Sequence, residues 1–594
     1  MITFKQASME SYFRTLNITD FDVSPQQDEI IYSTNLNGHY NLWAMKLDKG
    51  YPYQMTNTNQ MNSFVKYDPS GRYILTGYDF DGDEDYHVYA FPPTGGETTP
   101  ILQKKGEKYY YGELSKDGNT FYYVTSEGNP SFLNICRINL ETNEKEVLLS
   151  GDVGPSYLYS VSPDESSFAY SKSIGNTSAF GYIARNQEHI LISPAGEEAH
   201  RVSQVEYLTN DEVLVLSNFG SEFTYLASFH LQTKTFEKLV ELDGFELSQL
   251  TLDSTNNRVF FVAGRGAEDH LYVYELETKK LDRVDKPFDI VDKIVIKNGH
   301  LYTLGRSSVT PANLYRSEQL NDWEQLTEHQ LLGVKESELI QPEVLSYSSF
   351  DGLEIEALYF SPKKELDNGY TILWPHGGPQ WAERKNFRAI FQYLCSQGYR
   401  IFTPNFRGST GYGESFLKLV NKDWGGGPRL DIIAGMDWLI EQGKASTDKW
   451  FCIGGSYGGY MTLLLHGRHS DRFKAFVDIF GPSNLFTTLE TAPEHWKAAD
   501  AESIGDAVID REKLIEDSPM TYIDAMNKPM LVIQGANDPR VVKVESDVIV
   551  EAMQSRGQDV EYLVLEDEGH GFSKTENAIK VYKTMVSFLQ KYVD

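Results

Sequence analysis

The sequence has little cysteine: its 594 residues include only Cys136, Cys395 and Cys452. Such an odd and sparse set excludes a disulfide framework, and no Cys-x-x-Cys pair indicates a zinc site. Cys452 is expected to face a hydrophobic core as a small apolar side chain. We expect no metal ion and no other cofactor.

Long apolar runs are also missing. No run reaches the roughly 18–20 apolar residues that a membrane-spanning helix needs. Residues 1–13 lack the charged segment and the apolar core of a signal peptide. These absences predict a cytoplasmic protein that has no membrane partner.

Positive charge is scarce, because 54 lysine and arginine residues stand against 85 aspartate and glutamate residues, for a net charge of −31. A chain this acidic repels nucleic acid and anionic membrane surfaces, so we expect neither as a partner. Solubility is the plain interpretation of the charge. A more specific interpretation is that the negative charge attracts cationic substrates, but composition alone does not support it.

The first half of the chain repeats a short turn followed by an aromatic-rich strand. The turns recur about every 44–47 residues, at Ser24-Pro25, Asp68-Pro69, Ser115-Lys116 and Ser162-Pro163, and three weaker copies follow. Alternating apolar and polar residues are typical of half-buried strands. Seven such units between about residue 20 and residue 330 predict a seven-bladed β-propeller. A β-sandwich or two smaller β domains are the alternatives.

The second half of the chain alternates short apolar strands with helical segments. Strand-like runs include TILWP, RIFTP, WFCIGG and MLVIQG, and helix-like segments include RLDIIAGMDWLIEQG and VKVESDVIVEAMQSRG. This alternation predicts a mostly parallel, doubly wound sheet with helices on both faces. Because 594 residues exceed the size of a single core, we divide the chain into an N-terminal segment (1–20), a propeller (21–335) and an α/β domain (336–594). The N-terminal segment is expected to form a short helix that packs on the α/β domain.

A nucleophile motif lies in the α/β domain. Gly454-Gly455-Ser456-Tyr457-Gly458 fits the pattern G-x-S-x-G, and it follows a strand and precedes a helix. That context is the one a nucleophile elbow requires, since a tight turn flanked by small residues holds the serine hydroxyl above the sheet. The pattern predicts an α/β-hydrolase domain with Ser456 as its nucleophile. An incidental serine in a glycine-rich turn is the alternative.

A serine hydroxyl needs an adjacent base, and the base needs an acid that orients it. The α/β-hydrolase order of serine, acid and histidine favours His570, which lies in a glycine-flanked loop near the chain end. Asp538 follows the penultimate strand and is the predicted acid, with Asp478 as the second choice. Asp567 is too close to His570 along the chain to reach around its ring.

Two further histidines are weaker candidates for the base. His376 precedes the serine in the chain, and His466 lies on the helix after the elbow.

The oxyanion of an acyl-transfer reaction needs two preset hydrogen-bond donors. The backbone N–H of Tyr457, the residue after the nucleophile, is one. The loop 376–379, with sequence HGGP, follows an early strand and can bring a second backbone N–H close because it contains two glycines. An ordinary turn is the alternative for this loop.

These motifs together resemble the prolyl oligopeptidase family of serine peptidases. The matching segments span the C-terminal half in the family's order and are HGGP (376–379), PNFRGSTGYG (404–413), DWGGGPRLDIIAGMDWL (423–439), GGSYGGY (454–460), GANDPRV (535–541) and EGHGF (568–572). The N-terminal repeats match the propeller of that family. The acylaminoacyl peptidases are the most similar branch.

The resemblance implies roles for individual residues. Ser456, Asp538 and His570 match the catalytic triad, and Gly378 joins Tyr457 as an oxyanion donor. Arg540 matches an arginine that binds a substrate carbonyl, although an exposed, salt-bridged arginine is the alternative. The family propeller covers the active site, which implies short peptide substrates. A homo-oligomer, most simply a dimer, is also expected.

Two departures from other branches favour the acylaminoacyl branch. Prolyl oligopeptidases and dipeptidyl peptidases carry a tyrosine where this chain has His376. The propeller also lacks a convincing helix with paired glutamates of the kind that holds a free amino terminus in dipeptidyl peptidases. Glu197 and Glu198 lie in a strand-and-turn context and are expected to be solvated.

The acidic run from Asp79 to Asp85 resembles a calcium-binding loop. The EF-hand pattern needs glycine at its sixth position and glutamate at its twelfth, where this chain has Glu84 and Ala90. We therefore expect an acidic turn between propeller strands.

The sequence as a whole predicts a serine peptidase that releases N-acylated amino acids from short, blocked peptides and also hydrolyses simple esters. A general oligopeptidase or aminopeptidase, and a carboxylesterase, are alternative enzymes. A peptide-binding propeller with a silent hydrolase domain is the alternative from another class.

Overall fold

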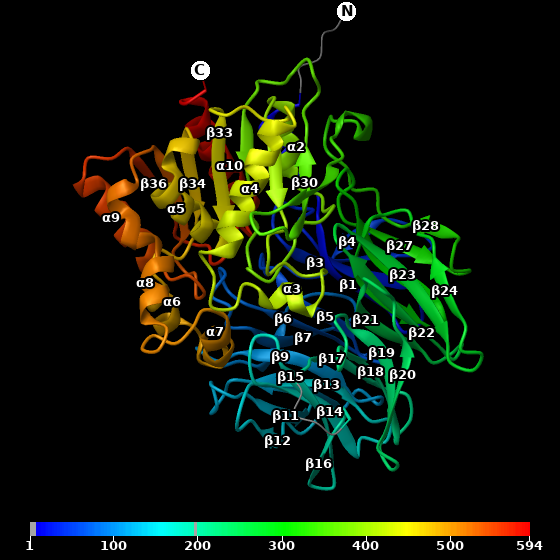
Figure 1. Cartoon of the computed structure of the whole chain (residues 1–594). Coiled ribbons are helices and arrows are strands. Elements are labelled where there is room, and N and C mark those ends of the chain that lie inside the picture. The colour runs from blue at the N-terminus through cyan, green and yellow to red at the C-terminus, as the bar shows by residue number, and fades with distance from the viewer. Residues whose placement is uncertain (1–6, 195–198, 594) are drawn as a thin grey trace, which may run out of the picture.

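Seven four-stranded antiparallel sheets form the first half of the computed structural model, which describes residues 7–194 and 199–593 (Figure 1). Each sheet is one blade, and its strands follow in chain order. The blades are β1 (Ile18–Val23), β2 (Glu29–Thr34), β3 (Asn41–Lys46), β4 (Pro52–Gln54); β5 (Asn62–Tyr67), β6 (Ile74–Tyr78), β7 (His87–Phe91), β8 (Thr99–Leu102); β9 (Tyr109–Leu114), β10 (Thr120–Thr125), β11 (Asn134–Asn139), β12 (Lys145–Ser150); β13 (Ser156–Val161), β14 (Ser167–Ser173), β15 (Ala179–Arg185), β16 (Glu188–Leu191); β17 (Val202–Tyr207), β18 (Glu212–Ser217), β19 (Tyr225–His230), β20 (Thr235–Val240); β21 (Glu246–Asp253), β22 (Arg258–Arg265), β23 (Glu268–Glu275), β24 (Leu281–Val284); and β25 (Ile290–Lys297), β26 (His300–Arg306), β27 (Asn313–Ser317), β28 (Trp323–Gln325). The predicted seven-bladed propeller is confirmed.

The recurring turn residues have a structural role that explains the repeat. The hydroxyls of Ser24, Ser115 and Ser162 each accept a hydrogen bond from the backbone N–H five residues later, at 2.9–3.1 Å. Each bond closes the turn between the first and second strands of a blade. Asp68 plays the same part in the second blade by accepting from the backbone N–H of Arg72 at 2.9 Å. A short oxygen-bearing side chain at this position therefore sets the turn of each of these blades.

Side chains on the first strands join neighbouring blades. Asp22, Glu113, Ser160, Gln204 and Gln249 hydrogen-bond to backbone groups of Tyr67, Val161, Val205, Leu250 and Val291, respectively, in the next blade. The last blade closes on the first through Lys293, which forms an ion pair with Asp20 and donates to the carbonyl of Phe21 at 2.8 Å. No strand of the described chain is shared between the first and last blades, so side-chain contacts join this seam.

The second half of the chain forms one eight-stranded sheet in the order β29-β30-β32-β31-β33-β34-β35-β36. Strand β30 is antiparallel to both of its neighbours, β29 and β32, and the remaining pairs are parallel. The strands are β29 (Glu343–Ser348), β30 (Glu354–Phe360), β31 (Thr371–Leu373), β32 (Arg400–Pro404), β33 (Trp450–Gly455), β34 (Ala475–Ile479), β35 (Met530–Gly535) and β36 (Val560–Leu565). This confirms the predicted α/β-hydrolase fold.

Helices cover both faces of this sheet, and the alternation along its strands explains why. In β33, Trp450 and Cys452 face one apolar core, and Phe451 and Ile453 face the other. Helices α4, α5 and α9 contribute to the first core and α2 and α10 to the second. The helices of this half are α2 (Ala389–Ser396), α3 (Glu414–Lys418), α4 (Gly427–Glu441), α5 (Tyr457–His469), α6 (Leu485–Thr491), α7 (Lys497–Ser503), α8 (Arg511–Asp517), α9 (Val544–Ser555) and α10 (Thr575–Gln590), and short 3₁₀ turns cover Glu336–Glu338, Ser470–Arg472, Glu494–Trp496 and Pro519–Ala525. Cys452 is fully buried in the first core, as expected.

The chain begins its described part with helix α1 (Met9–Phe13), which packs on α2 and α10 of the hydrolase domain. The ring of Phe13 stacks on Tyr582 at 4.5 Å, and Arg14 pairs with Glu576 at 2.7 Å. The first propeller strand starts at Ile18. Residues 1–6 of the predicted N-terminal segment lie outside the described residues.

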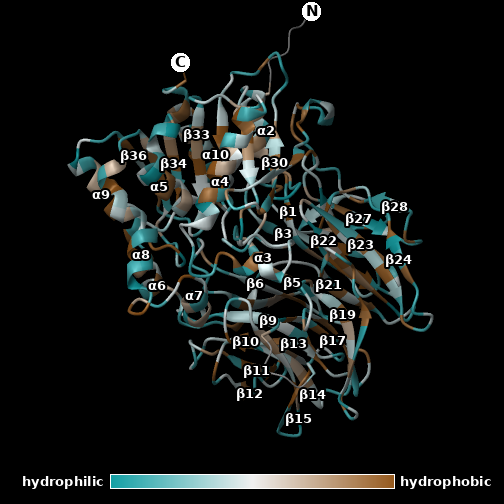
Figure 2. Ribbon diagram, viewed as in Figure 1, coloured by the Kyte–Doolittle hydropathy of each residue, from teal (hydrophilic) through white to brown (hydrophobic). Residues whose placement is uncertain are grey.

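Hydropathy follows this architecture. Figure 2 shows apolar residues, in brown, along the strands of both domains and hydrophilic residues, in teal, mainly on surface loops and helices. No helix in the described part of the chain is long and apolar enough to cross a membrane.

The propeller seam gives a testable expectation. Lys293→Met leaves the carboxylate of Asp20, whose side chain is 14% exposed, without its cation. We expect this change to lower the free energy of unfolding by about 1–3 kcal/mol, measured by calorimetry. Lys280→Met is the matched control, because Lys280 pairs with Asp282 on the open surface and such pairs contribute little. Equal stability of the two variants would contradict a role for Lys293 in closing the ring.

Candidate active site

Ser456 lies in a sharp turn between β33 and α5. Its backbone has φ 58° and ψ −125°, a conformation that is costly for a residue with a Cβ atom. The backbone N–H of Ser456 donates to the carbonyl of Ile479 at 3.0 Å, which holds the turn against β34. Small neighbours are obligatory: a Cβ on Gly454 would lie 2.1 Å from the carbonyl oxygen of Gly458, and one on Gly458 would lie 2.2 Å from that of Pro375. This is the geometry of a nucleophile elbow.

Three predicted residues meet at this turn. His570 Nε2 lies 3.0 Å from the Oγ of Ser456, and His570 Nδ1 lies 2.7 Å from the Oδ2 of Asp538. The other carboxylate oxygen of Asp538 accepts the backbone N–H groups of Arg540 and Val541, both at 2.9 Å. These bonds fix the buried carboxylate so that it holds the histidine with Nδ1 as donor and Nε2 facing the serine. The arrangement suits proton transfer from the serine hydroxyl.

The second-choice acid lies elsewhere. Asp478 is fully buried beneath the elbow, where its Oδ1 accepts the N–H of Gly481 at 3.0 Å. Burial raises the pKa of Asp478 well above its usual range. Asp567 pairs with Lys574 at 2.7 Å and accepts a hydrogen bond from Asn577. Neither carboxylate contacts His570.

The two competing histidines have structural partners. His376 stacks on Phe406 with ring centroids 4.1 Å apart, and its Nε2 lies 2.8 Å from the hydroxyl of Ser409. His466 accepts a hydrogen bond from the backbone of Lys528 at 3.1 Å. Burial lowers the pKa to about 4 for His376 and to about 3 for His466, so both rings stay neutral.

The loop that was expected to help hold the oxyanion abuts the elbow. A Cβ on Gly377 would lie 3.5 Å from the Cβ of Ser456, so the chain passes the nucleophile closely. Gly378 has φ +119° and precedes a cis bond to Pro379. Tyr457 is buried, and its hydroxyl donates to the carbonyl of Trp424 at 2.6 Å. Gly378, Tyr457 and Ser456 all line one cavity.

This cavity has a volume of about 940 Å³ and is lined by both domains. Ser456 and His570 come from the hydrolase domain, and Asn176 and Arg306 come from the propeller. Phe480 and Trp496 line the cavity, whereas Leu485 is buried in the core and Phe486 packs against it. The size falls at the upper end of the roughly 300–1,000 Å³ typical of ligand pockets.

Arg540 also lines the cavity, but it is already paired. Its Nε lies 2.6 Å from a carboxylate oxygen of Glu84, a propeller residue, and its guanidinium lies 5.5 Å from the ring of Trp496. Arg540 is therefore salt-bridged, as the alternative interpretation holds, and its contact with a substrate carbonyl stays a prediction.

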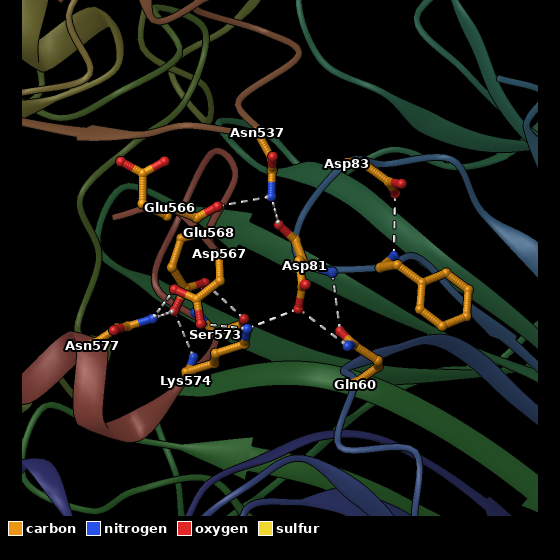
Figure 3. A network of polar contacts seen from close by, with 11 residues as sticks. Gln60, Asp81, Asp83, Asn537, Glu566, Asp567, Glu568, Ser573, Lys574 and Asn577 are labelled. Atoms are coloured by element: carbon orange, nitrogen blue, oxygen red, sulfur yellow. Dashed lines mark hydrogen bonds and ion pairs between the residues drawn. The ribbon is translucent and has the colours of Figure 1, made fainter. Parts of the chain in front are cut away.

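The acidic run from Asp79 to Asp85 lies between β6 and β7, as expected, but it also docks on the catalytic loops (Figure 3). Asp81 pairs with Lys574 at 2.8 Å, and its carbonyl accepts a hydrogen bond from Asn537 at 3.2 Å. Gly82 packs directly on Gly569, the residue before His570. The propeller thus contacts the loops that carry the catalytic acid and base.

Glu568 is a positioning residue that the sequence analysis missed. Its buried carboxylate accepts from the backbone N–H groups of Ser573 and Lys574, both at 2.9 Å, and from Asn577 at 2.9 Å (Figure 3). These bonds tie the histidine loop to the start of α10. Its role could have been predicted from its place a few residues before a helix, since helix N-termini favour acidic partners. Glu197 and Glu198, the glutamate pair considered as a site for a free amino terminus, lie outside the described residues.

The C-terminal part of the chain matches a known family. Residues 385–594 match the model described as the prolyl oligopeptidase family, which confirms the resemblance found in the sequence. Dipeptidyl aminopeptidase BIII of Pseudoxanthomonas mexicana is 43% identical over 211 residues, which are 35% of this chain and 31% of that protein. The acylamino-acid-releasing enzyme of Arabidopsis thaliana is 28% identical over 255 residues, 40% of this chain and 32% of that protein. The matched segments thus span about a third of these relatives.

Solved structures share the fold over nearly the whole chain. A puromycin-hydrolyzing peptidase of Mycobacterium tuberculosis has a TM-score of 0.86 at 19% identity, with 99% of this chain and 96% of that chain covered. An acylaminoacyl peptidase of Pyrococcus horikoshii has a TM-score of 0.76 at 19% identity, with 99% and 98% covered. At this identity the likeness describes the architecture of a propeller joined to an α/β-hydrolase domain.

The contact between Gly82 and Gly569 can be tested by one methyl group. A Cβ at residue 82 would lie 2.4 Å from the backbone nitrogen of Gly569, so Gly82→Ala must shift the histidine loop. We expect kcat/KM on a chromogenic ester to fall at least tenfold, because small misplacements of catalytic groups are costly.

The control for this variant is Gly38→Ala. Gly38 also has a positive φ, of +92°, but nothing lies within 4 Å of its added methyl group. It should reproduce the backbone cost of alanine and keep full activity. If both variants keep full activity, the propeller does not position the base.

Proposed function

We propose that this protein is a serine peptidase of the prolyl oligopeptidase family that hydrolyses short peptides. The hydrogen-bonded set of Ser456, His570 and Asp538 at a strained elbow is the observation that carries the proposal. A propeller with a silent hydrolase domain would have no need to maintain this geometry.

The proposed reaction begins when His570 Nε2 takes the proton of Ser456 as its oxygen attacks the scissile carbonyl. Backbone N–H groups of Tyr457 and Gly378 stabilise the negative charge on the tetrahedral intermediate. Asp538 stabilises the imidazolium, which then gives its proton to the leaving amine. Water, activated by the same histidine, releases the acyl group from Ser456. Simple esters react by the same steps because their leaving groups depart more easily.

Restriction to short peptides follows from the shape of the site. The cavity is walled by propeller and hydrolase residues together, and the acidic run of the second blade lies on the histidine loop. These walls support a restriction to short peptides, because a peptide of a few residues fits a cavity of about 940 Å³.

For the amino terminus of the substrate, we propose a blocked form as the first candidate. The similarity to an acylamino-acid-releasing enzyme and His376 at the start of the oxyanion loop support this choice. Glu383, a carboxylate of the cavity wall, pairs with Arg388 at 2.5 Å and is not free to bind an amine. Dipeptidyl peptidase activity is the second candidate, favoured by the 43% identity to a dipeptidyl aminopeptidase.

Replacement of the nucleophile tests the reaction class. Ser456→Ala should lower turnover of esters and peptides by about 10⁵-fold or more while circular dichroism stays unchanged. The wild-type chain should react once with a fluorophosphonate probe, and the variant should not. Turnover by a folded Ser456→Ala protein would contradict a serine mechanism.

The form of the amino terminus is tested by a matched pair of substrates. Acetyl-leucine 4-nitroanilide should have at least tenfold higher kcat/KM than leucine 4-nitroanilide, a difference of about 1.4 kcal/mol in transition-state binding. If a free glycyl-leucine 4-nitroanilide exceeds both, the dipeptidyl candidate replaces the acylaminoacyl one.

A further inference from the structure

The cavity contains one charge that no other side chain balances. Its other charged residues outside the catalytic triad form ion pairs: Arg306 with Asp292 at 2.7 Å, Arg388 with Glu383 at 2.5 Å, and Arg540 with Glu84 at 2.6 Å. Asp500 also lines the cavity, and its carboxylate forms no hydrogen bond or ion pair with any residue of the described ranges 7–194 and 199–593. Burial with no compensating charge raises the pKa of Asp500 to about 6.

Asp500 is held in place by the helix that carries it. Two residues further along α7, Glu502 accepts the backbone N–H of Asn176 and the hydroxyl of Thr177, each at 2.7 Å. The next residue, Ser503, accepts the indole N–H of Trp424 at 3.0 Å. The propeller and the hydrolase core therefore both fix α7, so the carboxylate belongs to a rigid wall.

Aromatic groups connect this wall to the nucleophile. Tyr457 follows Ser456, and its ring meets that of Trp424 with centroids 5.1 Å apart. Trp424 reaches α7 through its bond to Ser503. Trp496, one turn before Asp500, lines the same space. Flat aromatic faces suit the methylene stem and the charge of a basic side chain.

We infer that Asp500 makes this cavity a subsite for a cationic side chain, lysine or arginine, on the residue whose carbonyl Ser456 attacks. Asp500 is half-buried, so its carboxylate keeps contact with water but is less well solvated than on the open surface, and a bound ammonium or guanidinium group supplies the missing partner. The net charge of −31 acts in the same direction by attracting basic peptides. This inference rests on the proposed peptidase function and adds the substrate class to it.

The test uses two matched pairs of substrates, acetyl-lysine with acetyl-norleucine 4-nitroanilide for the blocked form and glycyl-lysine with glycyl-norleucine 4-nitroanilide for the free form. Norleucine keeps the straight aliphatic stem of lysine and lacks its charge. In whichever amino-terminal series reacts faster, the wild-type chain should have at least tenfold higher kcat/KM for lysine. Asp500→Asn should lower the lysine-to-norleucine ratio at least tenfold, and Asp500→Glu should restore part of it.

Glu490→Gln is the matched control, because Glu490 is an exposed carboxylate on the neighbouring helix α6 and its loss removes the same charge. It should leave the ratio within twofold of wild type. If both neutral variants lower the ratio equally, long-range charge explains the preference and the inference is wrong. If Asp500→Asn changes only the ratio of free to acetylated substrates, Asp500 binds the amino terminus and the inference is also wrong.

Binding to Ser456→Ala separates this inference from the proposed reaction. Calorimetry should give at least tenfold tighter binding of acetyl-glycyl-lysine amide than of the norleucine amide, and equal affinities would overturn the role of Asp500. Failure of the wild-type chain to react with a fluorophosphonate would instead overturn the peptidase function and leave the binding result to stand alone.

Discussion

Ser456 holds a backbone conformation that few residues with a side chain adopt, and the structure around it supports that conformation. The turn needs glycine at 454 and 458, because both positions meet backbone oxygens at about 2 Å from where a Cβ would lie. It also needs β34 at its side, since Ile479 accepts the N–H of the serine. The parallel sheet and helix α5 bring these supports together, so the core of the hydrolase domain stabilises the strain that exposes the hydroxyl.

Much of the fold and the triad could be predicted from the sequence, because the responsible signals are local. The serine that begins a propeller turn bonds to a backbone group five residues away, so the repeat is visible in the chain. The elbow and the loops of Asp538 and His570 each follow a strand. The contacts of Gly82 with Gly569 and of Glu84 with Arg540 join residues more than 450 positions apart. Nothing near either member of such a pair predicts its partner, so the docking of the acidic run could not be anticipated.

Both domains fix the positions of residues that line the cavity. Helix α7 is anchored on the propeller through Glu502 and on the hydrolase domain through Ser503, so neither domain alone sets the position of Asp500. Arg540 likewise belongs to the loop of the catalytic acid but pairs with a propeller carboxylate. Ion pairing neutralises Arg306, Arg388 and Arg540, which leaves Asp500 as the unpaired carboxylate among the described residues of the cavity wall.

The contact of the acidic run with the histidine loop has a consequence for motion between the two domains. The propeller, which forms part of the cavity wall, also contacts the loop that carries His570. The opening of the cavity and the position of the base are therefore coupled. Any motion that separated the propeller from the hydrolase domain would also withdraw the support of His570. In the peptidase that we propose, a folded protein would then meet a site whose base is out of position.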